Sequence, residues 1–338
     1  MQKYKLTSFG CKFCGSSNIV RYGVPKNIQY WLCRDCGHKF ADNDAIPRMK
    51  MSSSEVASAL GMYYRGMSID DIRNHLNEQY QTYLSTSTVY EWITRFTGEA
   101  IHKLKNEIPN VGDKWIADET VLDIGGHKVW FWDIIDAKTR FLLASHMSYS
   151  RTVQDAKTLV EQAAKRANKT PSVIYTDSLR AYIDGIELAF GSDTKHIQSK
   201  PFVNAQESTN IIERFQGTIK ERTKVMRGLK SPESAKLILD GYLVYYNFFR
   251  PHESLDNKTP AEVSRIHSDL KNWIDVVTKS REYVAPEPIA EPVVITGIPS
   301  YFNKNQYPKK YKPPHKPRRT LRYTGRPSAS IVISPRIK

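Results

Sequence analysis

Residues 114–136 read KWIADETVLDIGGHKVWFWDIID, and they predict a β-hairpin. Residues 114–123 alternate between polar and apolar side chains, as a half-buried strand does, and residues 128–136 form a second, more apolar strand. Between them, Gly125-Gly126 is typical of a tight turn that joins two antiparallel strands. The hairpin therefore begins a domain built around a β-sheet.

The segments after the hairpin alternate between strands and helices. In chain order we expect a strand at 140–146, a helix from Thr152 to about Asn168, a strand at 171–177, a helix at 179–190, a strand at 195–198, and a long helix that follows the loop near 204–207 and carries Glu213. This order of elements resembles that of ribonuclease-H-like domains. The expected fold class is therefore α/β, with a mixed five-stranded sheet flanked by helices.

Acidic residues stand at two positions of this sheet where an ionised group is costly. Asp118 lies in the middle of an apolar strand, and Asp177 lies at the carboxyl end of another. Burying an ionised carboxylate costs several kcal/mol unless a neighbouring group neutralises it. Mg²⁺ or Mn²⁺ does so, because both prefer hard oxygen ligands. With Glu213 as a third carboxylate, the pattern favours two metal ions about 3.5–4 Å apart that serve phosphoryl transfer.

Four motifs resemble those of DDE recombinases, the superfamily of insertion-sequence transposases and retroviral integrases. The first-strand motif is WIADET at 115–120, the second is YTDSLRAY at 175–182, the third is NIIERFQGTIKERT at 210–223, and the closing segment is NFFRPHESLDNKTPAE at 247–262. Asp177 and Glu213 are separated by 35 residues, the spacing characteristic of this superfamily. The likeness is greatest to the group named for insertion sequence six, in versions with an N-terminal zinc ribbon, and it covers about residues 8–265.

This resemblance implies a catalytic site and its cofactors. Asp118, Asp177 and Glu213 would form the catalytic triad and would hold two Mg²⁺ or Mn²⁺ ions per active site. Lys220 follows Glu213 by seven residues, which is two helical turns along the same face. The superfamily keeps a basic residue for DNA at that position, so Lys220 is expected to bind DNA.

Other polar residues near the proposed triad are expected to have different roles. We expect strand alternation to point Glu119 to the face opposite Asp118. Arg222 and Arg227 either follow DNA phosphates or belong to a solvated helix face, and Asn210 either caps its helix or positions the acid after it. The remaining residues are expected to be structural, namely Asp123 in a turn, Asp136 at a strand end, Asp184 on the surface, and His196 and His252.

All four cysteines of the chain lie near its N-terminus. They form two Cys-x-x-Cys-Gly knuckles, Cys11 to Cys14 and Cys33 to Cys36, with 18 residues between the pairs. The glycine relieves crowding so that backbone amides can turn toward the sulfurs, and four thiolates suit one structural, tetrahedral Zn²⁺. Residues 28–32 are expected to be the strand that leads into the second knuckle. The alternative is two disulfides, which the lack of a secretion signal disfavours.

Residues 52–96 have helical periodicity in three segments. Ser53 or Ser54 can cap a first helix that ends near Gly66, Ser68 begins a second, and Ser85 caps a third. On the third helix an apolar face (Val89, Trp92, Ile93 and Phe96) stands opposite a polar face (Ser87, Tyr90, Glu91, Thr94 and Arg95). The polar face suits contact with DNA, above all through Ser87, Tyr90 and Arg95, and STVYEW at 87–92 resembles the start of a transposase recognition helix. The same pattern also fits an ordinary three-helix bundle.

The charge of the chain indicates a polyanionic partner. Its 338 residues include 50 Lys and Arg against 35 Asp and Glu, a net charge of +15. Residues 300–338 hold 11 of these cations and no acid, and Pro residues interrupt them. We expect this tail to bind DNA backbone as a flexible arm through Lys309, Lys310, Arg318 and Arg319. A solubilising tail is the alternative.

Four regions result from these patterns. They are a zinc ribbon at 1–46, a helix-turn-helix DNA-binding domain at 50–106, a ribonuclease-H-like catalytic domain at 110–266, and a Pro-rich linker with the basic tail at 283–338. No stretch approaches 18 consecutive apolar residues, and the N-terminus lacks the apolar core of a secretory signal. We therefore expect a cytoplasmic protein, associated with the nucleoid of a prokaryote.

The combined interpretation is a DNA transposase. It would bind the terminal inverted repeats of an insertion sequence, cleave DNA strands in a metal-dependent reaction, and transfer them into target DNA. Because two element ends must be joined, we expect at least a homodimer on double-stranded DNA. Two alternatives remain: a domesticated DNA-binding regulator that performs no chemistry, and a nuclease of the same fold.

Overall fold

The computed structural model describes residues 10–43, 45, 49–198, 210–226 and 229–279. Arg227, the loop near 204–207 and the whole basic tail, with Lys309, Lys310, Arg318 and Arg319, lie outside the described residues. In the described part of the chain, no helix has both the length and the apolar character needed to cross a membrane.

A five-stranded mixed sheet forms the centre of the predicted catalytic region. Its strands are β4 (Lys114–Ile124), β5 (His127–Asp136), β6 (Leu142–Ser148), β7 (Val173–Thr176) and β8 (Lys195–Gln198). They lie in the order β6-β5-β4-β7-β8, with β4, β5 and β6 antiparallel and β7 and β8 parallel to β4. Three antiparallel strands followed by two parallel ones give the ribonuclease-H-like arrangement, which confirms the predicted fold class.

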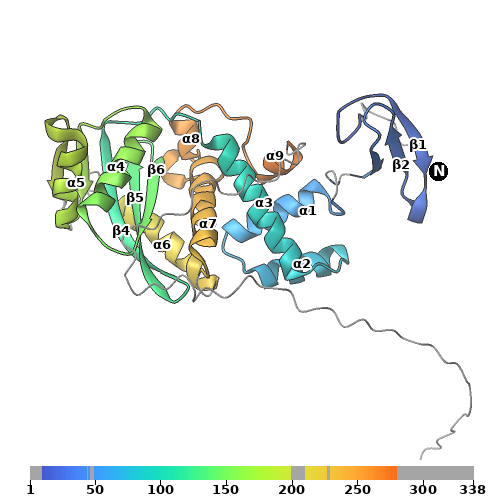
Figure 1. The fold of residues 1–338 in the computed structure, drawn as a ribbon, viewed down its shortest axis with the longest axis horizontal. Coiled ribbons are helices and arrows are strands. Elements are labelled where there is room, and N and C mark those ends of the chain that lie inside the picture. The colour runs from blue at the N-terminus through green and yellow to red at the C-terminus, as the bar shows by residue number, and fades with distance from the viewer. Residues whose placement is uncertain (1–9, 44, 46–48, 199–209, 227–228, 280–338) are drawn as a thin grey trace, which may run out of the picture. The chain divides into compact units, whose positions relative to one another are not determined.

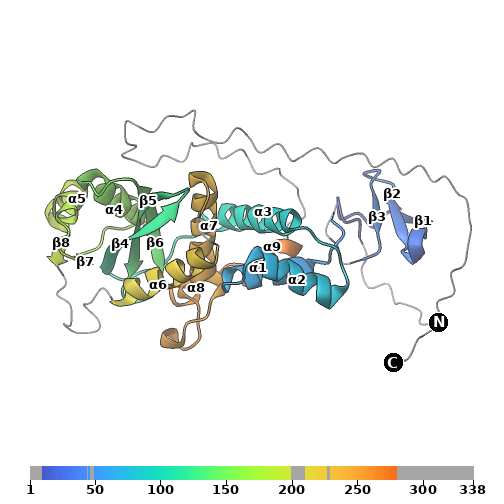
Figure 2. The same cartoon turned by 90° about the horizontal axis from the view of Figure 1, so that it is seen from below.

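Helices cover both faces of this sheet. Helices α4 (Val153–Ala167) and α5 (Arg180–Phe190) pack on one face, and α6 (Asn210–Val225) lies against β4 and β5 on the other, as Figures 1 and 2 show. The element boundaries agree with the predictions to within about two residues. The third strand starts at Leu142 instead of 140, because Arg140 has a positive φ of 58° in the turn before it.

The cysteine region forms its own small sheet. Strands β1 (Ile19–Gly23), β2 (Tyr30–Cys33) and β3 (Lys39–Ala41) are antiparallel in the order β1-β2-β3. Trp31 and Phe40 pack with two of the cysteines in a hydrophobic cluster of four buried residues. So small a core is insufficient for stability without a further cross-link or a metal.

Three helices follow, α1 (Ser53–Tyr64), α2 (Ile69–Tyr80) and α3 (Thr86–Leu104). Ser68 and Ser85 cap α2 and α3 as predicted. The predicted cap of α1 at Ser53 or Ser54 is wrong, because Ser52 makes a reciprocal capping box with Glu55 and both later serines lie inside the helix. The apolar face predicted for α3 is buried, with Val89, Trp92, Ile93 and Phe96 all at most 7% exposed.

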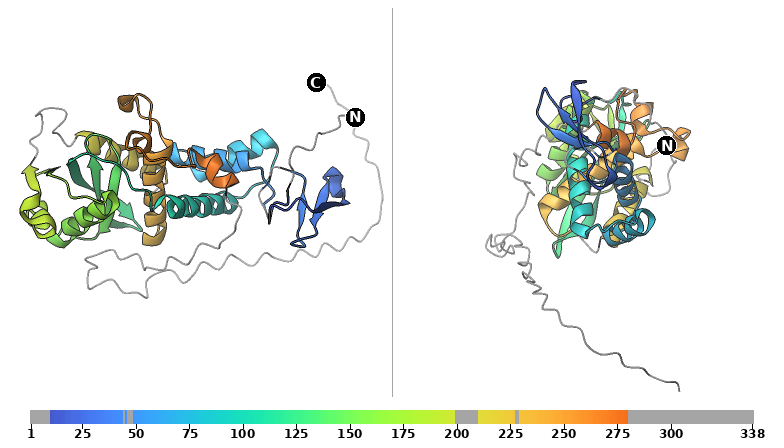
Figure 3. Two further views of the ribbon diagram at one scale, coloured as in Figure 1. Left: turned by 90° about the horizontal axis from the view of Figure 1, so that it is seen from above. Right: turned by 90° about the vertical axis from the view of Figure 1, so that its right-hand side faces the viewer.

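The C-terminal helices join α1 and α3 to the sheet domain. Helix α7 (Pro232–Val244) continues into a π-helical turn (Tyr245–Phe249) and is followed by α8 (Pro260–Val263) and α9 (Trp273–Thr278). Helix α3 packs on α7, and α1 packs on α9; Figure 3 shows these helices from above. One continuous hydrophobic core therefore runs from α1 to the sheet.

Tyr64 lies at the centre of this junction. It is 1% exposed, its ring stacks on Trp273 with centroids 4.9 Å apart, and its hydroxyl is hydrogen-bonded to that of Thr97 at 2.7 Å. Helix α7 approaches so closely here that a Cβ on Gly241 would lie 2.2 Å from the Tyr64 hydroxyl and 2.3 Å from Thr97 Cγ2. Only glycine leaves room for this contact.

We predict that Gly241→Ala destabilises the protein by about 1–3 kcal/mol, because the extra methyl group must displace α7 from α1 and α3. The matched control is Gly217→Ala on α6, where a Cβ would meet nothing within 4 Å. This control should stabilise the helix by about 0.5–1 kcal/mol. Urea unfolding of both variants measures the two effects. Equal changes in the free energy of unfolding would contradict the close approach of α7 to α1 and α3 at Gly241.

Candidate functional site

Two predicted catalytic acids meet beside the centre of the sheet. Asp118 lies on β4, and β7, which is parallel to β4, ends at Thr176 directly before Asp177. Because β7 stops there, Asp177 is free of the strand ladder and lies beside β4. Carboxylate oxygens of Asp118, Asp177 and Glu119 all lie within 4.8 Å of one another. The structure therefore brings the first two acids together and adds a third that was not expected there.

Glu213 approaches this group from helix α6. It lies in the first turn of α6, which packs against β4, and its charge contributes to the pKa of Asp118. Its side chain is exposed, and it does not belong to the group of carboxylates within 4.8 Å. Glu213 thus borders the site at a greater distance than Asp177 does.

The environment of Asp118 favours its protonated form in the absence of a cation. Burial raises its pKa to about 7, and the negative charge of Glu119 adds to this effect, followed by those of Asp177 and Glu213. A divalent cation would reverse this balance by stabilising the ionised carboxylates. Ionisation of all the acids is therefore unfavourable at this site unless metal ions neutralise their charge.

Glu119 has partners on the side of the sheet opposite Asp118, as strand alternation predicts. Its Oε1 accepts a hydrogen bond from the guanidinium of Arg151 at 2.8 Å, and its side chain is 2% exposed. Burial raises the pKa of Glu119, and the charge of Asp177 adds to the rise, whereas Arg151 and the hydroxyl of Tyr182 oppose it. The side chain is long enough to bring an oxygen to the Asp118–Asp177 pair, and this reach was not predicted.

Asp133 is a further acid that the sequence interpretation missed. It lies directly opposite Asp118 in the β4–β5 register, is fully buried, and neither of its oxygens has a hydrogen-bond partner in the described structure. Burial raises its pKa well above the usual range, and the charge of Asp118 adds to this. The available signal was an acid between Trp132 and Ile134 in an otherwise apolar strand.

The donor set of this cluster fits Mg²⁺ or Mn²⁺. Carboxylates are hard oxygen ligands, and one such cation holds its ligands at about 2.0–2.1 Å, so small side-chain rotations would bring oxygens spread over 4.8 Å to a shared ion. Two unpartnered oxygens on Asp133 beside Asp118 show that the protein alone does not satisfy the acids here. Asp118 and Asp177 are therefore the residues best placed to hold a divalent cation.

The cysteines form a second group with metal-ligand geometry. All four Sγ atoms lie within 4.8 Å of one another, with 3.6 Å between Cys11 and Cys36 and 3.6 Å between Cys14 and Cys33. A tetrahedral Zn²⁺ with Zn–S bonds of about 2.3 Å has sulfurs about 3.8 Å apart. The four cysteines are free thiols in the structure, so neither of two disulfides is formed.

Backbone amides point toward the sulfurs, as a metal knuckle requires. The Phe13 amide lies 3.4 Å from Cys11 Sγ, and hydrogen bonds from the amides of Cys36 and Asp35 lower the pKa of Cys33 to about 7, against the opposing effect of burial. Gly15 and Gly37 have positive φ angles of 76° and 72°, which allow these turns. The donors and their surroundings fit Zn²⁺.

The predicted DNA-contacting residues differ in their accessibility. Lys220 on α6, and Ser87 and Tyr90 on α3, are exposed. Arg95 is half-buried and pairs with Glu99 at 3.1 Å.

Arg222 requires a correction. It is 4% exposed, with its guanidinium 3.9 Å from the centre of the Tyr63 ring. Its burial contradicts the solvated helix face, and in this structure its guanidinium lies against the Tyr63 ring of α1 instead of being accessible to DNA phosphates.

The residues expected to be structural have structural partners. Asp123 accepts a hydrogen bond from the Gly126 amide at 3.0 Å in the hairpin turn, and Asp184 is exposed. Asp136 is buried at the end of β5 and accepts from the amide and the hydroxyl of Thr139 at 2.7 Å each. The two histidines are hydrogen-bonded, His196 to the Thr176 hydroxyl at 2.8 Å and His252 to the Tyr246 carbonyl at 3.2 Å.

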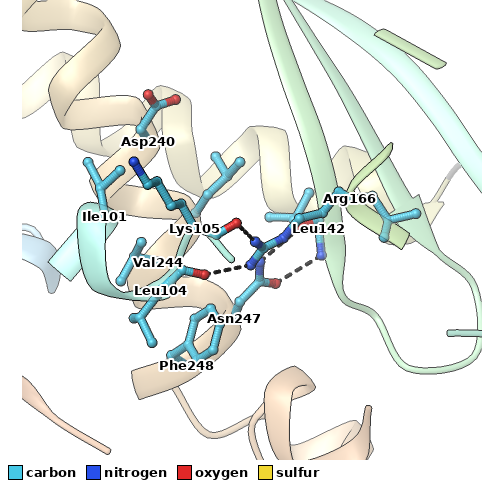
Figure 4. Close-up of a pocket in the computed structure, with 11 residues that line it drawn as sticks. Ile101, Leu104, Lys105, Leu142, Arg166, Asp240, Val244, Asn247 and Phe248 are labelled. Atoms are coloured by element: carbon cyan, nitrogen blue, oxygen red, sulfur yellow. Dashed lines mark hydrogen bonds between the residues drawn. The ribbon is translucent and has the colours of Figure 1, made fainter. Parts of the chain in front are cut away.

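A cavity of about 120 Å³ lies between α3, β6, α4 and α7, and none of the acids of the sheet lines it (Figure 4). Its polar side chains serve the fold. Arg166 donates to the carbonyls of Leu104 and Lys105 at the end of α3, and the Asn247 amide exchanges two hydrogen bonds of 2.9 Å with the backbone of Leu142. The polar side chains around the cavity therefore connect α4 to the end of α3 and the segment after α7 to β6.

The sequence of the sheet domain has a family match. Residues 112–252 match the DDE domain of IS240-type transposases. This range is less than half of the chain, and it contains Asp118, Asp177, Glu213 and Lys220 together with the first part, 247–252, of the closing segment. No curated protein matches the chain.

Solved integrase structures also resemble the chain. The HTLV-2 integrase catalytic core domain in complex with magnesium is 18% identical, with 46% of this chain and 97% of that chain covered and a TM-score of 0.36. The BIV integrase catalytic core domain is 19% identical, with coverages of 46% and 94% and a TM-score of 0.36. The simian T-cell lymphotropic virus intasome in complex with PP2A regulatory subunit B56 gamma is 14% identical, with coverages of 64% and 77% and a TM-score of 0.37.

We predict that Asp118→Asn stabilises the protein at pH 8 when no Mg²⁺ or Mn²⁺ is added. The folded-state pKa of about 7 exceeds the unfolded value, so the folded state binds the proton more tightly and stability falls as the pH rises from about 4 to 7. Asparagine removes this penalty, which amounts to about 2–4 kcal/mol after allowance for partial exposure.

Urea unfolding at pH 5 and pH 8 measures this difference. The gap between Asp118→Asn and the wild type should open as the pH rises. Asp123→Asn, on the same strand but exposed in the turn, should follow the wild type at both values. A constant difference between Asp118→Asn and the wild type would show that burial of Asp118 has been misjudged.

Proposed function

We propose that this chain is a DNA transposase of the DDE type that cuts the ends of an insertion sequence and joins them to target DNA. The observation that carries the proposal is the meeting of Asp118 and Asp177 beside β4, with Glu213 approaching on α6, inside the range that matches a DDE domain. Partly buried acids that repel one another are poorly suited to a purely structural role. They are well suited to holding divalent cations.

Each of these residues has a defined task in the proposal. Asp118, Asp177 and Glu213 hold Mg²⁺ or Mn²⁺, two ions per active site. When bound, these ions would neutralise negative charge on the reacting phosphate and would activate the attacking oxygen as a nucleophile. Lys220, exposed on the same helix as Glu213, binds a DNA phosphate and orients the strand.

The chemistry consists of two successive in-line displacements at phosphorus. In the first, the oxygen of water forms a bond to phosphorus as the P–O3′ bond at the element end breaks, which leaves a 5′-phosphate on the flanking strand and a free 3′-hydroxyl that takes up a proton. That hydroxyl then attacks a target phosphodiester, forming one P–O bond as another breaks and a target 3′-hydroxyl leaves with the proton. Neither step needs a covalent bond to the protein, so positioning and charge neutralisation supply the catalysis.

Recognition of DNA belongs to the N-terminal regions in this proposal. The cysteine ribbon binds one structural Zn²⁺, and α3 presents Ser87 and Tyr90 to the terminal inverted repeats. Two ends must be joined, so the active form is at least a dimer on double-stranded DNA. Assignment to the group named for insertion sequence six, and the role of the basic tail as a DNA-binding arm, belong to the same proposal.

We predict that Asp118→Asn and Asp177→Asn bind element-end DNA with wild-type affinity but lower strand transfer by at least about 10³-fold. The assay uses pre-cleaved end DNA, supercoiled target and Mg²⁺ or Mn²⁺. Asp184→Asn, an exposed acid on α5, is the matched control and should retain activity.

The products of the wild-type protein distinguish the alternatives. Joined DNA supports a transposase, hydrolysis without joining indicates a nuclease, and binding without product indicates a regulator. Joining by Asp118→Asn at the wild-type rate would refute the role of this residue.

We predict that the purified protein contains one equivalent of Zn²⁺ and that Cys33→Ser loses it. The ribbon should then unfold, because metal binding supplies most of its folding free energy, about 10–16 kcal/mol in small zinc modules. Metal content by mass spectrometry and binding of end DNA measure the two consequences. Ser17→Ala in the same ribbon, outside the knuckles, should keep both the metal and the binding.

A further inference from the structure

Helix α6 carries a buried cation that the proposed chemistry does not use. Arg222 is 4% exposed, and within the described residues none of its three guanidinium nitrogens has a hydrogen-bond partner. Burial lowers its pKa, and the neighbouring tyrosines Tyr63, Tyr64 and Tyr242 oppose that shift. No acid pairs with Arg222 in the described structure, which is unusual for a buried arginine.

The contact that Arg222 does make is with helix α1. Its guanidinium lies over the ring of Tyr63, 3.9 Å from the centroid, and the Tyr63 hydroxyl contacts Met226 Sδ at 3.8 Å just beyond the C-terminal end of α6. Tyr63 is 1% exposed and packs edge-on against Tyr64, with centroids 5.3 Å apart. Because Tyr64 is fixed by α3 and α9, Arg222 ties α6 to a rigid aromatic cluster.

Stability alone does not account for this residue. Transfer of a cation out of water is unfavourable, and a contact with an aromatic ring recovers only part of the loss. An apolar side chain of similar length would fill the same space without that penalty. Because Arg222 lowers stability relative to such an apolar side chain, its presence at this position indicates a role in function.

The position of Arg222 on α6 suggests what that role is. Glu213 and Arg222 are nine residues apart, which is about two and a half turns, so they project from opposite sides of the helix. Ile212, Phe215 and Ile219 form the buried stripe between them. A roll of α6 about its axis would therefore move Glu213 and Arg222 together.

The distance between Glu213 and the carboxylate cluster depends on that roll. Glu213 lies near enough for its charge to act on Asp118, yet outside the group of oxygens within 4.8 Å. A rotation of α6 would therefore change the distance between Glu213 and a cation held by Asp118 and Asp177. Arg222 is the one charged residue buried on the opposite edge of this helix among the described residues.

We propose that Arg222 is a positioning residue, which through its contact with the Tyr63 ring sets the roll of α6 and so places Glu213 at the divalent-cation site. This inference rests on the proposed function, and it adds a residue outside the acidic cluster to the catalytic apparatus. It also links α1, next to the proposed DNA-binding helix, to the metal site through one side chain.

Arg222→Met tests the proposal, because methionine keeps the length and removes the charge and the planar stack. Strand-transfer turnover should fall about 10–100-fold, as expected for a misplaced catalytic group, while the affinity for end DNA stays unchanged. The apparent Tm without added divalent metal should not fall. Lys224→Met removes an exposed cation from the same helix and is the matched control, with turnover at the wild-type level.

A second readout does not depend on activity. Mn²⁺ should raise the Tm of the wild type by binding the folded state, and this rise should be smaller in Arg222→Met, as in Glu213→Gln. Tyr63→Leu should reproduce the Arg222→Met phenotype, whereas Tyr63→Phe keeps the ring and should retain turnover. Arg222→Met combined with Tyr63→Leu should be no worse than either alone.

Several results would overturn the proposal. They are wild-type turnover in Arg222→Met, a Mn²⁺-induced rise equal to that of the wild type, and a loss of folding in both Arg222→Met and Tyr63→Leu. If the wild type forms no DNA product but Mn²⁺ raises its Tm, the proposed function fails while the Tm comparison still tests Arg222. If Mn²⁺ has no effect on the wild type, the positioning role fails as well.

Discussion

The acids of the sheet repel one another, and the rest of the site is organised around that repulsion. Asp118 and Asp133 face each other across two neighbouring strands, Asp177 ends a third, and Glu119 reaches the same point from the other face. Burial in an apolar sheet raises the pKa of Asp118 and of Asp133, so the protonated forms of these two acids are favoured unless a cation neutralises them. The strong hydrophobic core around them supplies the stability that such a cluster removes.

Helix α6 differs from the strands in how it is held. β4 and β5 are fixed by a continuous antiparallel ladder, so the positions of Asp118 and Asp133 are set by backbone hydrogen bonds. Glu213 belongs to a helix whose position depends on packing against β4 and β5 and on the contact of Arg222 with the Tyr63 ring of α1. The third carboxylate is therefore the part of the site that tertiary contacts can adjust.

Local patterns were enough to predict much of this structure. The hairpin, the caps at Ser68 and Ser85, and the end of α4 at Asn168 follow from short-range rules of turn and cap chemistry. The cysteine knuckles also follow from spacing alone. The wrong cap for α1 shows the limit of such rules, because three adjacent serines are equivalent until the reciprocal bond to Glu55 selects Ser52.

Long-range register and packing explain what the sequence did not reveal. The relevance of Asp133 follows only from its pairing with Asp118, and Glu119 joins the cluster because its side chain reaches Asp118 and Asp177 in the folded sheet. The burial of Arg222 depends on Tyr63, which lies 159 positions earlier in the chain. Nothing in the local sequence of α6 distinguishes this arginine from one on a solvated face.

The regions that the sequence analysis treats as separate domains differ in whether they have a hydrophobic core of their own. The ribbon has its own hydrophobic cluster and its own group of metal-ligand side chains, so its folding depends on a local cross-link. Helices α1 to α3 instead share one core with α7 and α9, and α9 lies beyond residue 266, the expected end of the catalytic domain. Thr97 of α3 is hydrogen-bonded to Tyr64, Tyr64 packs on Tyr63, and Arg222 of α6 lies over the Tyr63 ring, so a shift of α3 would strain this aromatic cluster. Under the proposed function, DNA binding at α3 would therefore be coupled to the position of Glu213 through the packing of these side chains.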